Sequence, residues 1–123
     1  MARILIVEDE PAVAEVASLV CRRDGHEVAV TRSAAAALEA LRLEAFDLVL
    51  TDVAMEGMDG IQLAAEIRGI VGLEGLPIIG VTALATPTER AEMEAAGIDA
   101  VIAKPYSGRA LAAAIAELLS TGR

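Results

Sequence analysis

Five short apolar runs alternate with five amphipathic stretches along the chain, and this alternation constrains the fold more than any other feature. The runs cover residues 4–7, 28–30, 46–50, 78–81 and 100–103. Short apolar runs bounded by polar turns predict strands. Between them apolar residues recur at helical spacing, as at Leu63, Ala64 and Ile67. The sequence therefore predicts five strand-helix units in order.

Strict alternation of strands and helices favours a parallel sheet, because neighbouring parallel strands need right-handed helical crossovers. We therefore expect an α/β fold with helices on both faces of a doubly wound sheet. The second and fifth runs have less continuous apolar character. We expect these two strands to form the edges of the sheet.

Capping residues mark the helix starts. Candidate first-turn residues are Pro11, Ser33, Asp59 before Gly60, and Ser107. The clearest start is Thr86-Pro87-Thr88-Glu89, in which Thr86 can accept from first-turn amides and Glu89 can reach back to complete a capping box. Gly25 and Gly97 follow helical stretches where a left-handed C-terminal cap favours glycine.

Length and composition limit the class of protein. A chain of 123 residues suits one compact domain, so we expect a single domain over residues 1–123 without an output domain. No apolar stretch reaches the ~18 residues that span a membrane, and the start shows no secretory cleavage site, so we expect a cytoplasmic protein. Cys21 is the only cysteine, which excludes an intrachain disulfide. A net charge of −9 disfavours binding to nucleic acid or anionic lipid.

Chemically reactive side chains follow four of the five expected strands. They are Glu8, Asp9 and Glu10 after the first, Asp52 after the third, Thr82 after the fourth and Lys104 after the fifth. Taken singly, the acids suit turns or caps, Thr82 suits a strand and Lys104 suits a solvated surface. Ligands of doubly wound sheets bind outside the carboxyl ends of the strands, so we expect these side chains to converge there.

Convergence would give these residues a joint chemistry. Clustered carboxylates repel one another unless a divalent cation or raised pKa values relieve the repulsion. Oxygen ligands favour Mg²⁺, which keeps open positions and binds phosphate oxygens. An aspartate carboxylate can accept a phosphoryl group, and Thr82 and Lys104 could stabilise the phosphoryl oxygens. Lys104 is the only lysine among ten basic residues.

With these residues placed, the chain resembles a response-regulator receiver domain, similar to the single-domain chemotaxis regulators, over essentially its whole length. The motifs that carry the resemblance are ILIVEDEP, DLVLTDVAMEGMDG, IIGVTA and GIDAVIAKPY. The resemblance implies a flavodoxin-like (βα)5 fold whose five parallel strands have the order 2-1-3-4-5.

The resemblance also implies roles for individual residues. Asp52 would be the phosphoacceptor, and Asp9, Asp52 and the backbone carbonyl of Ala54 would bind Mg²⁺, with Glu8 acting through a water. The phosphoryl donor would be a phosphohistidine on a sensor histidine kinase or a histidine phosphotransfer protein. The chain would then not be an enzyme beyond its own phosphorylation and slow dephosphorylation.

The same resemblance implies how a signal would leave the site. Thr82 would be the switch hydroxyl, and Lys104 would be joined to Pro105 by a cis peptide bond. Phosphorylation would draw Thr82 toward the phosphoryl group and shift the surface of the fourth helix, fifth strand and fifth helix, where a downstream protein would bind.

The sequence departs from the family pattern at several positions. Val101 stands where an aromatic switch residue is common, Glu56 replaces a usual proline and Glu8 replaces a commoner aspartate. Two residues beyond the phosphoacceptor and the switch hydroxyl lie Ala54 and Leu84, where polar side chains can orient hydrolytic water. Because both are apolar, we expect slow self-dephosphorylation.

Other functions remain open on this fold. A binding module that works without phosphorylation is the main alternative, although the intact acidic cluster argues against it. A flavodoxin-like cofactor protein would need a neutral phosphate loop, where this chain has Glu8, Asp9 and Glu10. A metal-dependent phosphatase would need a second general acid, which Val53 and Ala54 do not offer.

Overall fold

Strands and helices alternate strictly along the chain, as the sequence predicts. The computed structural model describes residues 1–121. The strands are β1 (Arg3–Val7), β2 (Glu27–Thr31), β3 (Leu48–Asp52), β4 (Ile78–Thr82) and β5 (Ala100–Ala103). The helices are α1 (Pro11–Arg23), α2 (Ala34–Leu43), α3 (Gly60–Arg68), α4 (Pro87–Ala95) and α5 (Gly108–Ser120). The domain expected over residues 1–123 includes residues 122–123, which lie outside the described part.

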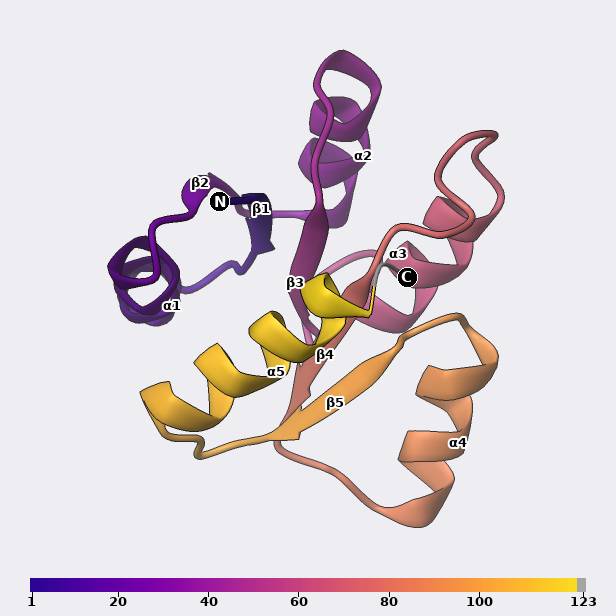
Figure 1. Ribbon diagram of the computed structural model, residues 1–123. Helices are drawn as coiled ribbons and strands as arrows, with labels where there is room; N and C mark the ends of the chain where they lie inside the picture. Colours follow the sequence, from indigo (N-terminus) through magenta and orange to yellow (C-terminus); the bar gives the residue numbers. More distant parts are fainter. Residues whose placement is uncertain (122–123) are drawn as a thin grey trace.

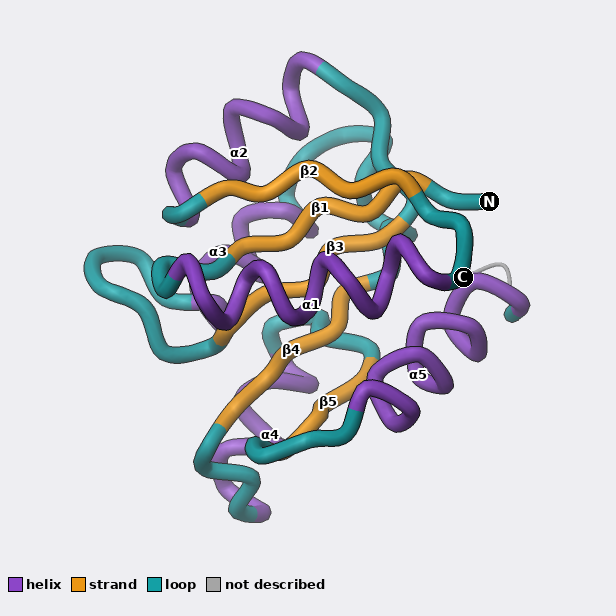
Figure 2. The backbone as a smooth tube through the Cα atoms, turned by 90° about the vertical axis from the view of Figure 1, so that its left-hand side faces the viewer, coloured by secondary structure: helices purple, strands orange, loops and turns teal. Residues whose placement is uncertain are grey.

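The five strands form one parallel sheet of order β2-β1-β3-β4-β5, which confirms the expected doubly wound fold. Helices α1 and α5 cover one face of this sheet, and α2, α3 and α4 cover the other (Figures 1 and 2). The chain order changes direction between β1 and β3. In folds of this kind the ligand site lies at that point, outside the carboxyl ends of the strands.

Each face of the sheet has its own apolar core, because alternate residues of a strand point to opposite faces. Under α1 and α5 the buried residues include Ile6, Leu50, Cys21, Leu111 and Ile115. Under α2, α3 and α4 they include Leu5, Val49, Leu41, Ile67 and Met93. The central strands β3 and β4 are buried along their whole length, whereas β2 and β5 are partly exposed. The edge strands are therefore the two that the sequence predicts.

The third strand starts later than its apolar run indicates. The run begins at Phe46, but β3 begins at Leu48. Phe46 instead packs against the edge of a core, and the Arg3 guanidinium lies 4.8 Å from the centre of its ring. Phe46 is thus apolar because it covers the core, and the prediction of a strand over residues 46–47 is wrong.

Side-chain caps fix most of the helix starts. Ser33, Asp59 and Ser107 each accept a hydrogen bond from an amide in the first turn of the helix that follows. Helix α1 begins at Pro11 as predicted, but its N-cap Glu10 makes no side-chain cap. Gly25 has a φ of +85°, in the left-handed region that the sequence predicts for it.

The capping box expected at α4 forms only in part. The Thr86 hydroxyl accepts a hydrogen bond from the Glu89 amide, as predicted. The Glu89 carboxylate does not complete the box. It accepts instead from the Thr82 hydroxyl at the end of β4, with a distance of 3.4 Å between Thr82 Oγ1 and Glu89 Oε1. The carboxylate that the sequence assigns to the cap of α4 therefore contacts the end of β4 instead.

Within residues 1–121 no helix is both long enough and apolar enough to cross a membrane.

Candidate functional site

The register of the sheet brings the predicted site residues together at the carboxyl ends of the strands. Asp52 of β3 is paired with Val81 of β4, and Thr82 of β4 is paired with Ala103 of β5. Val7, the last residue of β1, is paired with the residue before Asp52. The strand ends therefore finish almost level, and Figure 2 shows β1, β3 and β4 running side by side.

Three carboxylates meet at this edge. Each of Glu8, Asp9 and Asp52 offers an oxygen, and these three oxygens lie within 4.8 Å of one another. The Glu8 and Asp52 side chains belong to residues only 5% and 6% exposed, so little water screens their charges. The pKa of Glu8 is raised to about 7, chiefly by burial and in addition by the nearby charge of Asp52. The cluster holds more negative charge than its surroundings relieve.

Lys104 supplies a positive charge on the same carboxylate. Its Nζ atom lies 3.3 Å from Asp52 Oδ1 and donates a hydrogen bond to it. The Lys104 side chain is 31% exposed, so its ammonium is hydrated on one side. The backbone amide of Lys104 donates to the carbonyl of Thr82 at 2.8 Å, which anchors the residue to the end of β4. The bond to Pro105 is cis, as the resemblance implies.

A backbone brace holds the Asp52 carboxylate and the loop after it. The Ala54 amide donates to Asp52 Oδ1 at 3.3 Å. The start of α3 approaches so closely that a Cβ atom on Gly60 would lie 2.5 Å from the Asp52 carbonyl oxygen. The Gly60 amide donates to the Val53 carbonyl at 2.9 Å. Glycine is therefore required here by space, since any side chain would displace the backbone of the candidate phosphoacceptor.

The Thr82 hydroxyl both donates and accepts a hydrogen bond. It donates to Glu89 Oε1 at 3.4 Å and accepts from the Leu84 amide at 3.0 Å. Thr82 is 3% exposed, whereas Leu84 is 63% exposed. The loop between β4 and α4 thus folds back on the hydroxyl and leaves the Leu84 side chain at the surface.

Residues at the mouth of the site are solvent-exposed. An open hollow there is lined by Asp9, Glu10, Ala54, Met55, Glu56 and Asp59. Ala54 and Glu56 are exposed, so the carboxylates can be reached from solvent on this side. Val101 does not line this hollow. It packs against the apolar core under α2, α3 and α4.

Two contacts at the site are not indicated by any sequence pattern. The Gly60 approach depends on how α3 packs on β3, and the sequence marks only a glycine after an N-cap aspartate. The contact between Glu89 and Thr82 joins residues seven apart, and the local capping pattern offered a competing explanation for Glu89. The predicted side chains of Glu8, Asp9, Asp52, Thr82 and Lys104 nevertheless lie together at the carboxyl ends of the strands, and Ala54 lies beside Asp52 in the loop after β3.

The donor set fits a hard divalent cation. It consists of carboxylate oxygens without sulfur or imidazole, which suits Mg²⁺ better than zinc or copper. The pKa of Glu8 is raised by burial and also by the charge of Asp52, and a cation would offset the second of these causes. The adjoining ammonium and hydroxyl are groups that stabilise phosphoryl oxygens. Together the residues can hold a metal ion and an anionic group side by side.

Comparison with known proteins gives relatives that match over most of this chain. The sensor protein GacS of Pseudomonas syringae pv. syringae is 39% identical over 113 residues, and the response regulator protein FleR of Pseudomonas aeruginosa is 40% identical over 110. Each match covers 89% of this chain. The sensory transduction protein RegX3 of Mycobacterium tuberculosis is 33% identical over 99% of it. The chain spans only 12%, 23% and 52% of the lengths of these three relatives.

Solved structures agree with this result. The signal receiver domain of a histidine kinase from Syntrophus aciditrophicus has a TM-score of 0.91 and 33% identity, and the alignment covers 98% of this chain and 92% of that chain. A CheY-like receiver domain protein from Methanospirillum hungatei has a TM-score of 0.91 and 30% identity, with 98% and 95% covered. The response regulator receiver domain family matches residues 4–116. The carboxylate cluster, its lysine and its threonine thus lie in a chain that belongs to the response regulator receiver domain family.

Proposed function

We propose that this domain accepts a phosphoryl group on Asp52 from a phosphohistidine, and that Mg²⁺ is required for the transfer. The observation that carries the proposal is the convergence of Glu8, Asp9 and Asp52 within 4.8 Å, with the Lys104 ammonium 3.3 Å from Asp52. Membership of the receiver family supports it. The site offers a nucleophile, a cation site and a counter-charge on one edge of the sheet.

The transfer forms one bond and breaks another. A carboxylate oxygen of Asp52 forms a bond to phosphorus, and the bond between phosphorus and the donor imidazole nitrogen breaks. The electron pair of that bond stays on the imidazole nitrogen. The histidine leaves as neutral imidazole when its other ring nitrogen already carries a proton, and otherwise the imidazolate takes up a proton from water. The product is an acyl phosphate on Asp52.

The residues around Asp52 would divide the remaining work. Asp9, Asp52 and the backbone carbonyl of Ala54 would hold Mg²⁺, with Glu8 acting through a water. When bound, the ion neutralises charge on the phosphoryl oxygens. Lys104 is placed to hold another phosphoryl oxygen by a charge-assisted hydrogen bond. Its present ion pair with Asp52 orients the carboxylate before the donor arrives.

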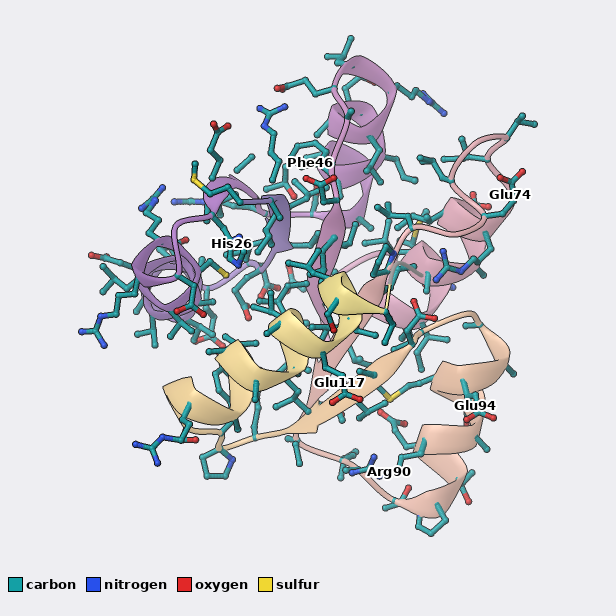
Figure 3. The ribbon with its side chains drawn as sticks, viewed as in Figure 1. His26, Phe46, Glu74, Arg90, Glu94 and Glu117 are labelled. Atoms are coloured by element: carbon teal, nitrogen blue, oxygen red, sulfur yellow. The ribbon has the colours of Figure 1, made fainter. Side chains whose placement is uncertain are left out.

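The signal would leave through the surface of α4, β5 and α5. Thr82 ends β4, and the loop that follows it leads directly into α4. Figure 3 shows Arg90 on α4 and Glu117 on α5, and both residues are exposed. A sensor histidine kinase or a histidine phosphotransfer protein would be the donor, and a downstream protein would bind this surface. We place these events in the cytoplasm and assign no other enzymatic activity to the domain.

A binding module that works without phosphorylation is not favoured. Such a module would not need three carboxylates held together against their repulsion, yet Glu8 and Asp52 are both buried at the site. Keeping buried charges together costs stability unless a ligand relieves them. The intact cluster therefore supports a phosphoacceptor.

Transfer from a protein phosphohistidine tests the proposal. A histidine phosphotransfer protein carrying radiolabelled phosphate on its histidine is mixed with wild type, Asp52→Asn or Asp24→Asn. Asp24 is an exposed aspartate at the end of α1, so its variant is the matched control. We expect label on wild type and Asp24→Asn only, and none when EDTA removes Mg²⁺. Equal labelling of Asp52→Asn would overturn the assignment of the phosphoacceptor.

A further inference from the structure

We propose that Glu89 is a positioning residue that holds the hydroxyl proton of Thr82 until the phosphoryl group arrives. The inference rests on the proposed function and adds to it a group from α4 that competes with the phosphoryl oxygens. It starts from the contact between Thr82 Oγ1 and Glu89 Oε1, which are 3.4 Å apart. Glu89 is partly buried, so its carboxylate is shielded from bulk water on the side of Thr82.

A threonine hydroxyl has one proton to donate. In this structure that proton is directed at Glu89, while the hydroxyl oxygen accepts from the Leu84 amide at 3.0 Å. To donate to a phosphoryl oxygen on Asp52, Thr82 must give up its bond to Glu89. The carboxylate therefore opposes the same movement of Thr82 that phosphorylation favours.

The hydrogen bond between Thr82 and Glu89 also connects the site to the first turn of α4. Glu89 lies in the first turn of α4, where its amide donates to the N-cap hydroxyl of Thr86 at 3.1 Å. Release of its side chain would therefore remove one restraint between the end of β4 and the first turn of the helix whose surface we propose as the output. Val101 cannot report the change as an aromatic ring would, because it is an aliphatic residue packed on the core. Glu89 offers another route from Thr82 to α4.

Removing the carboxylate should make Thr82 more available. We expect Glu89→Ala to accept a phosphoryl group from acetyl phosphate, in the presence of Mg²⁺, about 2- to 5-fold faster than wild type, in keeping with a long, partly exposed hydrogen bond. Glu89→Gln keeps an amide oxygen that can accept from the hydroxyl, so its rate should stay close to that of wild type. Glu94→Ala, on the exposed part of α4 (Figure 3), controls for the loss of one negative charge.

A second variant separates hydrogen bonding from charge. If Glu89 acts through Thr82, then adding Glu89→Ala to Thr82→Ala should not change the rate further. If Glu89 merely repels the anionic phosphodonor, then Glu89→Gln and Glu89→Ala would both be faster and the acceleration would persist in the Thr82→Ala background. That second pattern, or equal rates in Glu89→Ala and Glu94→Ala, would overturn the inference.

Hydrogen exchange tests the restraint without any phosphorylation. The Leu84 amide donates a hydrogen bond to the same hydroxyl. Its hydrogen should therefore exchange about 2- to 5-fold faster in Glu89→Ala than in wild type. The exchange rates in Glu89→Gln and Glu94→Ala should stay close to that of wild type. Equal exchange in wild type and Glu89→Ala would refute the restraint. If wild type takes no phosphoryl group, the proposed function fails, and the exchange data still decide whether Glu89 holds Thr82.

Discussion

Lys104 and Asp52 form an ion pair across the width of a strand, with 3.3 Å between Lys104 Nζ and Asp52 Oδ1. Asp52 ends β3 and Lys104 follows β5, and the sheet order places β4 between these two strands. The lysine side chain therefore reaches over the end of β4, where Thr82 lies. This one contact joins three strand ends into a single site.

Loss of the Lys104 ammonium should slow phosphorylation more than it affects folding. We expect Lys104→Met to accept a phosphoryl group from acetyl phosphate roughly 10- to 100-fold more slowly, because a charge aimed at the phosphoryl oxygens is lost. Asp52 is only 6% exposed and loses its counter-charge in this variant, so the thermal midpoint should fall while the protein stays folded at the assay temperature. Intact mass against time and thermal unfolding check the two expectations. A wild-type rate in Lys104→Met would contradict the role given to Lys104.

The raised pKa of Glu8 predicts how stability depends on pH when no divalent cation is present. The pKa of Glu8 is about 7 in the folded protein against an ordinary value of 4.5. Between these values the folded state binds the Glu8 proton and the unfolded state does not, so the free energy of unfolding falls as pH rises from about 4.5 through about 7. Chemical unfolding in EDTA measures this slope.

A Glu8→Gln variant supplies the control for this effect. The amide does not titrate, so the decline in stability over the same pH range should become shallower. Adding Mg²⁺ at pH 8 should stabilise wild type, because the ion binds the folded cluster and not the unfolded chain. An identical pH profile in wild type and Glu8→Gln would refute the assignment of the raised pKa to Glu8.

Gly60 should tolerate no side chain. A Cβ atom at this position would lie 2.5 Å from the Asp52 carbonyl oxygen and 2.8 Å from Val53 Cα. We expect Gly60→Ala to lower the free energy of unfolding by about 2 kcal/mol or more, because backbone must shift to admit the methyl group. Gly69→Ala is the matched control, because Gly69 has a φ of −83° and an added Cβ atom would come no closer than 3.5 Å to its neighbours. Denaturant unfolding of both variants checks the difference, and an unchanged midpoint in Gly60→Ala would contradict the close approach.

The aspartyl phosphate should be long-lived. Ala54 and Leu84 stand at positions two residues beyond Asp52 and Thr82, and neither side chain can orient water for attack. The exposed Leu84 side chain leaves room for a longer polar one. Wild type should therefore lose its phosphoryl group no faster than Ala54→Asn or Leu84→Glu. Decay measured by intact mass after removal of the donor tests this, and faster loss from wild type would contradict it.

Much of the fold could be predicted because its signals are local and periodic. The apolar runs and the helical spacing between them predict the alternation of strands and helices along the chain. Ser33, Asp59 and Ser107 act as the caps that their positions indicate. The start of β3 was predicted two residues too early because of Phe46. An apolar side chain that covers a core has the same sequence signal as a buried strand residue.

The site could be predicted as far as it depends on strand ends. Asp52, Thr82 and Lys104 converge because parallel strands finish at one edge of the sheet. The bond between Glu89 and Thr82 and the approach of Gly60 to Asp52 could not be predicted. Both depend on how a helix packs against the sheet, which no local pattern records.

Intact mass after incubation with Mg²⁺ and acetyl phosphate tests the central claim most directly. The account predicts a single phosphoryl adduct on wild type, no adduct on Asp52→Asn and an unchanged adduct on the exposed control Asp24→Asn. Circular dichroism of the Asp52→Asn variant establishes that it is folded. An adduct of equal yield on folded Asp52→Asn, or no adduct on wild type with Mg²⁺ bound, would contradict the account.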